Sequence, residues 1–106
     1  MPTASAVQAQ SSGAIIVEID AHMKKSGILN KDWYVGITSD INERLFGFHQ
    51  VPRENHWFIY RRALNSSEAR SIEAAYHRAG CTGGGSGGDH TAVYIYAYVI
   101  TPTTVE

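Results

Sequence analysis

The stretch WYVGITSDINERL, residues 33–45, decides how the rest of the chain can fold. Its first six residues (33–38) are mostly β-branched or aromatic, which is typical of a buried strand. Asp40 can cap a helix, and Glu43 follows it at the spacing of a capping box. Apolar residues then recur at helical spacing. The stretch therefore predicts a strand over 33–38 and a short α-helix over about 40–48.

The segment before this strand, residues 13–26, carries two competing patterns. Ile15 and Ile19 recur at helical spacing, but residues 17–21 also alternate as in a strand. A serine at the start, two lysines in the last turn and Gly27 just beyond favour the helix. We therefore predict a helix over 13–26.

The segments after the central stretch read as strand, helix and strand, over 57–63, 66–79 and 91–100. The predicted order is α-β-α-β-α-β, with a small three-stranded sheet covered by helices. This is an α/β (α+β) fold. We expect one domain over residues 13–106, preceded by a mobile, small and polar tail over 1–12.

The composition and charge of the chain exclude several classes of protein. The 106 residues carry a net charge of −1, which excludes a globally basic nucleic-acid coat, but residues 44–78 hold six arginines against three glutamates. A single cysteine, Cys81, offers neither a disulfide nor a zinc-ligand pair. The sequence has no secretory signal and no apolar run long enough for a membrane, so we expect a cytoplasmic protein without membrane contact. An exposed sheet edge could pair two copies into a homodimer.

The glycine-rich segment over 81–89 matches a dinucleotide fingerprint only literally, through Gly83, Gly85 and Gly88. That fingerprint needs a strand before the glycines and a helix after them, whereas here a helix precedes and a strand follows. We predict a flexible connector, which can approach a neighbouring backbone closely.

The central stretch resembles part of a known family signature. The residues that carry the resemblance are Tyr34, Val35, Gly36, Thr38, Asp40, Arg44, Leu45 and His49. They look like the second half of the GIY-YIG nuclease signature, and the ten-residue step from Tyr34 to Arg44 also fits. Downstream, the strand beginning at Trp57 and the helix carrying Glu73 fall where that family has its third strand and its metal-binding glutamate. The resemblance covers roughly residues 33–79.

The resemblance implies a small domain that hydrolyses DNA phosphodiesters with Mg²⁺ or Mn²⁺. By carry-over, Tyr34 would position or deprotonate the attacking water, Arg44 would stabilise the phosphate, and Glu73 would hold the metal ion. His49 is a further catalytic candidate. On a continuous α-helix, side chains five residues apart point about 140° apart. His49 would therefore meet Arg44 only if the helix ends near Phe48.

The first strand of that family, which carries its own tyrosine, has no counterpart before Tyr34. The strand VYIYAY (93–98) could take its place in the sheet, and Tyr94, Tyr96 or Tyr98 would then supply the tyrosine. These three residues share one strand face, which could equally stack nucleobases or pack against a helix.

Of the three tyrosines, Tyr96 is the one we assign to catalysis. Tyr94, with Arg61 and Arg62, is a nucleic-acid-binding candidate. The alternative to a metal-dependent DNA endonuclease is a catalytically lapsed relative that binds nucleic acid or a protein partner with the same face.

Overall fold

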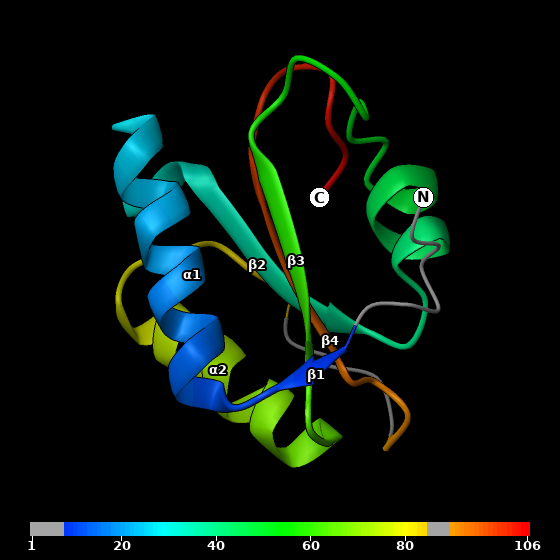
Figure 1. The fold of residues 1–106 in the computed structure, drawn as a ribbon. Helices are drawn as coiled ribbons and strands as arrows, with labels where there is room; N and C mark the ends of the chain where they lie inside the picture. Colours follow the sequence, from blue (N-terminus) through cyan, green and yellow to red (C-terminus); the bar gives the residue numbers. More distant parts are fainter. Residues whose placement is uncertain (1–7, 85–89) are drawn as a thin grey trace.

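The computed structural model describes residues 8–84 and 90–106. It is a mixed α+β fold in which one sheet separates two groups of helices (Figure 1). Helices α1 (Ser12–Ser26) and α2 (Ser66–Arg78) cover one face, and the helix η3 (Asn42–Phe48) covers the other. In these ranges no helix combines the length and the apolar character needed to cross a membrane.

The sheet contains four strands in the order β1-β3-β4-β2. Strand β4 (Tyr94–Val99) is antiparallel to both of its neighbours, β2 (Trp33–Thr38) and β3 (Phe58–Ala63). The short β1 (Ala9–Gln10) adds to β3 in parallel. The strand that comes last in the chain therefore lies in the interior of the sheet.

The prediction of three strands was wrong by one. Strand β1 falls within residues 1–12, which we predicted as a mobile tail, and two residues carry too little pattern to be recognised as a strand. Pairing with β3 at Arg62 and Ala63 orders them. The first seven residues of that predicted tail, like 85–89 of the predicted glycine connector, lie outside the described residues.

Both α-helices begin and end as the capping residues predict. The Ser11 hydroxyl accepts from the Ala14 N–H at the start of α1, and Gly27 ends that helix in the left-handed conformation at φ 71°. At the start of α2, the Asn65 side chain accepts from the Glu68 N–H at 2.9 Å. Local chemistry therefore fixes the ends of both elements, whose bounds match the predictions to within one residue.

Helix η3 is a π-helix, which corrects the predicted α-helix over 40–48. Asp40 still accepts from the Glu43 N–H, as the capping pattern predicts. The helix ends on a bond from the His49 N–H to the Arg44 carbonyl, five residues back. Since π-helical bonds join residues five apart, His49 lies above Arg44 on the same side of the helix. The helix also ends at Phe48, which is the condition stated above for His49 to approach Arg44.

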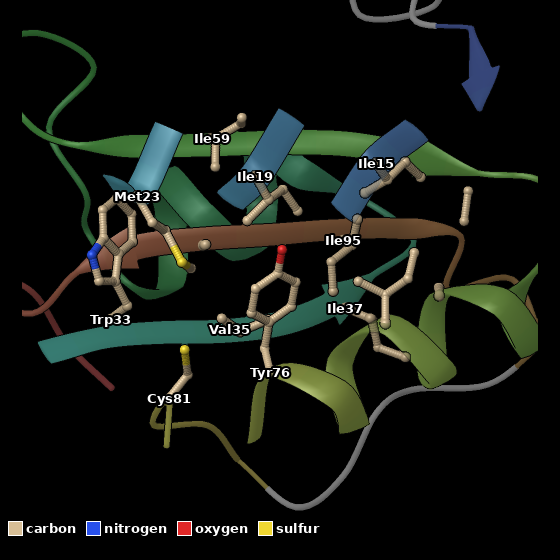
Figure 2. Packing of buried hydrophobic residues seen from close by; sticks show 14 of the residues in the cluster. Ile15, Ile19, Met23, Trp33, Val35, Ile37, Ile59, Tyr76, Cys81 and Ile95 are labelled. Atoms are coloured by element: carbon tan, nitrogen blue, oxygen red, sulfur yellow. The ribbon is translucent and has the colours of Figure 1, made fainter. Parts of the chain in front are cut away.

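Each face of the sheet has its own core. Toward α1 and α2, alternate strand residues pack with the buried stripes of both helices, and Figure 2 shows this cluster around Val35, Ile95 and Tyr76. The opposite face, under η3, is lined by a cluster that includes Tyr34, Tyr96 and Tyr98. The predicted shared face of the β4 tyrosines is confirmed, and it is the face that carries the candidate site.

The outer edge of β2 is partly occupied, which bears on the expected homodimer. The Val35 N–H donates to the Thr82 carbonyl, and the Thr82 N–H donates to the Trp33 carbonyl, both at 2.8 Å. His77 reaches the Val35 carbonyl at 2.9 Å. These contacts take up backbone groups that a second copy would need for strand pairing.

Candidate functional site

The site forms where β4 passes beside β2. Tyr96 lies directly opposite Gly36, and Tyr98 lies opposite Tyr34. A Cβ atom on Gly36 would come within 2.5 Å of the Tyr96 hydroxyl, so the tyrosine ring occupies the space that glycine leaves. The Tyr34 ring in turn lies nearly parallel to both β4 rings, at centroid distances of 6.3 Å to Tyr96 and 5.2 Å to Tyr98.

His49 sits at the centre of this cluster and is fully buried, at 0% exposure. Its Nε2 lies 2.8 Å from the Tyr96 hydroxyl, and its Nδ1 lies 2.5 Å from the Val105 carbonyl oxygen. The Tyr98 hydroxyl is 3.0 Å from the same Nδ1. Burial lowers the pKa of His49, with a smaller lowering from the positive charge of Arg44, whereas the Val105 carbonyl raises it. The ring is therefore kept neutral and hydrogen-bonded on both nitrogens.

Arg44 is brought to the cluster by the wide turn of η3. Its guanidinium lies 4.3 Å from the centre of the Phe48 ring and is half-buried. Its positive charge lowers the pKa of His49, of Tyr96 and of Tyr98, so the guanidinium lies within electrostatic reach of all three. Burial raises the pKa of Tyr96, and Arg44 opposes that rise only in part. Tyr96 is therefore a neutral phenol at physiological pH.

The described start of the glycine segment, up to Gly84, packs over Tyr34. The Gly84 N–H donates to the Tyr34 hydroxyl at 2.9 Å, and a Cβ on Gly84 would fall within 2.9 Å of that oxygen. A Cβ on Gly83 would overlap the His77 ring. The described part of the predicted connector is thus a close-packed segment over a candidate residue, which explains why glycine stands at both positions.

Glu73 lies on α2, which covers the face of the sheet opposite the tyrosine cluster. Burial raises the pKa of this half-buried carboxyl, and the neighbouring His77 and Arg70 lower it by less. The charge of Glu73 also raises the pKa of Tyr96, so the two groups lie within electrostatic reach of each other. Among the described residues, no three His, Cys, Asp or Glu side chains gather into a metal-binding group. Glu73 is therefore a single carboxylate anchor, which suits Mg²⁺ when water and phosphate oxygens complete the shell.

Two of the three nucleic-acid candidates lie together, and the third lies on the other face of the sheet. Arg61 points to the helical face and pairs with Glu18 at 2.5 Å. Arg62 is exposed on the opposite face and lies directly across from Tyr94, two residues along β4 from Tyr96. Arg62 and Tyr94 therefore adjoin the site, whereas the guanidinium of Arg61 serves an internal ion pair.

Sequence reasoning left three contributors unassigned. Tyr98 was one of three equivalent tyrosines, and its position opposite Tyr34 follows from the register of β2 and β4. Val105 contributes only backbone atoms, so nothing in its side chain could identify it. His77 contacts the Val35 carbonyl at the edge of the sheet through its Nε2. Only the alternation of β4 could have indicated Tyr98 in advance.

A comparison of this chain with protein-family models, with curated proteins and with solved structures finds no match. The site is therefore interpreted from its own geometry.

Proposed function

We propose that the chain is a GIY-YIG-type nuclease domain in which β4 takes the position of the family's first strand. One observation carries the proposal. The interior strand β4 sets Tyr96 against Gly36, and the Tyr96 hydroxyl lies 2.8 Å from Nε2 of His49, which follows η3 directly. The charge of Arg44, in η3, reaches the same hydroxyl. A tyrosine from the far end of the sequence thus meets the residues that resemble the second half of the signature.

The reaction that fits these groups is hydrolysis of a phosphodiester. A water oxygen bonds to phosphorus and one ester bond breaks, so the leaving oxygen gains one proton and the phosphate keeps the hydroxyl group. Arg44 presents a planar pair of donors to the phosphate oxygens and stabilises the added charge. Tyr34 orients the attacking water through its hydroxyl. These two residues and Glu73 are the ones we assign to contact with the substrate.

Glu73 is the group that would hold Mg²⁺ or Mn²⁺. Its carboxyl is desolvated, and a cation beside it would remove the cost of keeping it charged. When bound, the metal supplies Lewis-acid stabilisation of the phosphate and of the leaving oxygen.

DNA is the substrate that we infer from the surroundings of the site. Arg62 and Tyr94 lie on the face that carries Tyr96, where the exposed Arg62 can meet a phosphate and the half-buried Tyr94 ring can meet a base. The excess of arginine over glutamate in residues 44–78 gives the supporting charge. Binding through such contacts weakens with rising salt.

A second candidate function rests on burial. Tyr96 and His49 have exposures of 1% and 0%, so neither offers its polar atoms to a substrate in this structure. This favours a lapsed domain that binds nucleic acid or a protein through the same face without cleaving. The two candidates share the fold and differ in the outcome of one assay.

The deciding experiment is cleavage of supercoiled plasmid and branched DNA with Mg²⁺ or Mn²⁺. Wild type is compared with Glu73→Gln and Arg44→Ala, and the matched controls are Glu54→Gln and Arg53→Ala. Arg53 also lies over a ring, that of Phe46 at 3.9 Å, but outside the cluster. We expect cleavage by wild type and both controls, and its loss in both site variants.

Equal cleavage by all five proteins would contradict the site assignment and indicate a contaminating nuclease. An inactive wild type that binds DNA with strong salt dependence would support the lapsed binding domain. An inactive wild type without salt-dependent binding would remove DNA from both candidates and leave a protein partner.

A further inference from the structure

Strand β3 presents two aromatic rings and one cation on the face of the sheet that carries the tyrosine cluster. Phe58, Tyr60 and Arg62 are alternate residues of this strand, so their side chains leave the sheet on the same side. We call these three residues the β3 row. Both rings are half-buried and Arg62 is exposed, so every member of the row keeps some surface that a ligand can reach.

Neighbouring side chains hold the row in place. The Phe46 ring of η3 meets the Phe58 ring at 84°, with 5.2 Å between their centres. Tyr60 lies directly across from the buried Tyr96 of the candidate site, and adjacent strands are about 4.8 Å apart. Rings that are already fixed lose little conformational freedom when a ligand stacks on them. The β3 row is therefore a preformed surface that adjoins the candidate site.

The spacing of the two rings fits separated bases better than stacked ones. The Phe58 and Tyr60 rings are parallel, at an angle of 1°, and their centres lie 6.5 Å apart. Consecutive bases in one strand of a duplex are stacked at about 3.4 Å, which is roughly half of that separation. Two neighbouring bases can therefore each meet a ring only where the strand is unpaired and extended.

The cation of the row complements such a strand. Arg62 is the next member along β3 after Tyr60, and a guanidinium presents two donors to the oxygens of a phosphate. Tyr94 lies directly across from Arg62 and adds a third half-buried ring beside it. Aromatic side chains next to a positive charge are the usual means by which proteins bind single strands without reading their sequence.

We propose that the β3 row binds a single-stranded segment of DNA, with bases stacked on Phe58 and Tyr60 and a phosphate on Arg62. A strand bound in this way passes beside Tyr96. The row therefore selects substrates in which an unpaired strand adjoins the bond to be cleaved, such as branched DNA. This choice of substrate rests on the proposed nuclease function, whereas the binding of a single strand does not.

The test is fluorescence anisotropy with the full-length protein, in EDTA so that metal-dependent cleavage cannot occur. The probes are a labelled thymidine strand of about 12 nucleotides, within the usual range of site sizes, and a duplex of the same length. Wild type is compared with Tyr60→Leu, which removes the ring, and with Tyr60→Phe, which keeps it. Arg62→Ala removes the cation. Its matched control is Arg78→Ala, because Arg78 is exposed at the end of α2 on the other side of the sheet.

We expect wild type to bind the single strand more tightly than the duplex. Tyr60→Leu should weaken single-strand binding by about 5- to 100-fold, the usual range for the loss of one stacked base, whereas Tyr60→Phe should bind as wild type does. Arg62→Ala should weaken binding and reduce its dependence on salt, and Arg78→Ala should change neither. Equal affinity for duplex and single strand, or a Tyr60→Leu protein that binds as tightly as wild type, would overturn the proposal.

A second measurement uses wild type alone and does not depend on how the variants fold. A base that stacks on an aromatic ring moves the proton NMR signals of that ring upfield. Titration with the thymidine strand should therefore shift the ring signals of Phe58 and Tyr60. The rings of Trp57 and Tyr76, which pack on the other face, should keep their shifts. Unshifted Phe58 and Tyr60 signals in the presence of saturating strand would overturn stacking on the row.

Cleavage separates this proposal from the nuclease proposal. If the nuclease is active, Tyr60→Leu should raise KM for branched DNA by about the factor that it costs in binding, with kcat unchanged. An active nuclease whose KM does not respond to Tyr60→Leu would contradict the row alone. An inactive wild type that binds the single strand through Tyr60 would contradict the nuclease proposal alone.

Discussion

The Tyr96 hydroxyl lies 2.5 Å from the point where a side chain at Gly36 would begin. Because Tyr96 is buried and hydrogen-bonded, its ring cannot swing away without leaving His49. We therefore expect Gly36→Ala to lower the free energy of unfolding by about 1–3 kcal/mol, the usual cost of overpacking a core. Urea denaturation measures this loss, and the loss of the His49–Tyr96 contact should abolish any cleavage.

Gly13→Ala is the matched control, because a Cβ at that position in α1 meets nothing within 4 Å. Alanine should stabilise the helix there by roughly 0.5–1 kcal/mol. If both alanine variants have the same stability as wild type, the close approach of Tyr96 to Gly36 does not exist in solution.

Glu73→Gln should make the protein more stable at pH 7 while abolishing cleavage. Burial raises the pKa of Glu73, so the folded state disfavours its charge, and this destabilisation lessens as pH falls through the raised value. Glutamine removes the charge at every pH. Urea denaturation of wild type and variant at pH 7 compares their free energies of unfolding. A less stable variant would show that the positive charges of His77 and Arg70 stabilise the Glu73 carboxylate by more than burial destabilises it.

Lowering the pH should reduce the free energy of unfolding, because His22 and His49 favour their neutral forms in the folded state. The pKa of His49 and that of His22 are both lowered by burial, so the unfolded chain binds protons more readily than the folded one. Stability is complete above the ordinary histidine pKa of about 6.5 and decreases as pH falls from there through the lowered values. Each histidine can contribute a slope of up to about 1.4 kcal/mol per pH unit.

Urea denaturation between pH 7.5 and pH 5, at intervals of about one unit, measures that slope in wild type, His49→Gln and His22→Gln. Each variant should lose the part of the pH dependence of the unfolding free energy that its own histidine contributes. A His49→Gln protein with the full wild-type slope would mean that His49 is not held neutral in the fold.

Tyr34→Phe should loosen the glycine segment without unfolding the domain. The variant removes the acceptor of the Gly84 N–H but keeps the ring that packs against Tyr98. Hydrogen exchange at the Gly84 amide should therefore accelerate, whereas the amides of β4 should keep their protection. Tyr60→Phe is the control, and an unchanged Gly84 rate in Tyr34→Phe would show that the hydroxyl does not hold this segment.

The elements whose local pattern and caps agree could be predicted from sequence. The strand over 33–38 has the predicted bounds, and α1 and α2 begin at their capping residues. The π-helix could not be predicted, because its pattern of Ile41, Leu45 and Phe48 also fits an α-helix. The structure buries His49 and leaves Phe48, the third residue of that pattern, 47% exposed.

The site was partly predictable for a similar reason. Tyr34 and Arg44 lie within one local motif, and alternation along β4 singled out Tyr96 and its two neighbours as candidates. The contact between Val105 and His49 depends on how the segment after β4 folds back over η3. No local pattern encodes it, since the atoms involved at residue 105 belong to the main chain.

The interior position of β4 has a consequence for how the molecule forms. During synthesis, β2 and β3 leave the ribosome well before residues 94–99. Until β4 emerges, neither strand can form its hydrogen bonds with it. Closing the sheet requires a long loop between β2 and β4, which slows folding and leaves the apolar strands open to aggregation. Chains halted before residue 94 should therefore depend on chaperones, whereas emergence of residues 94–99 allows both neighbouring strands to pair.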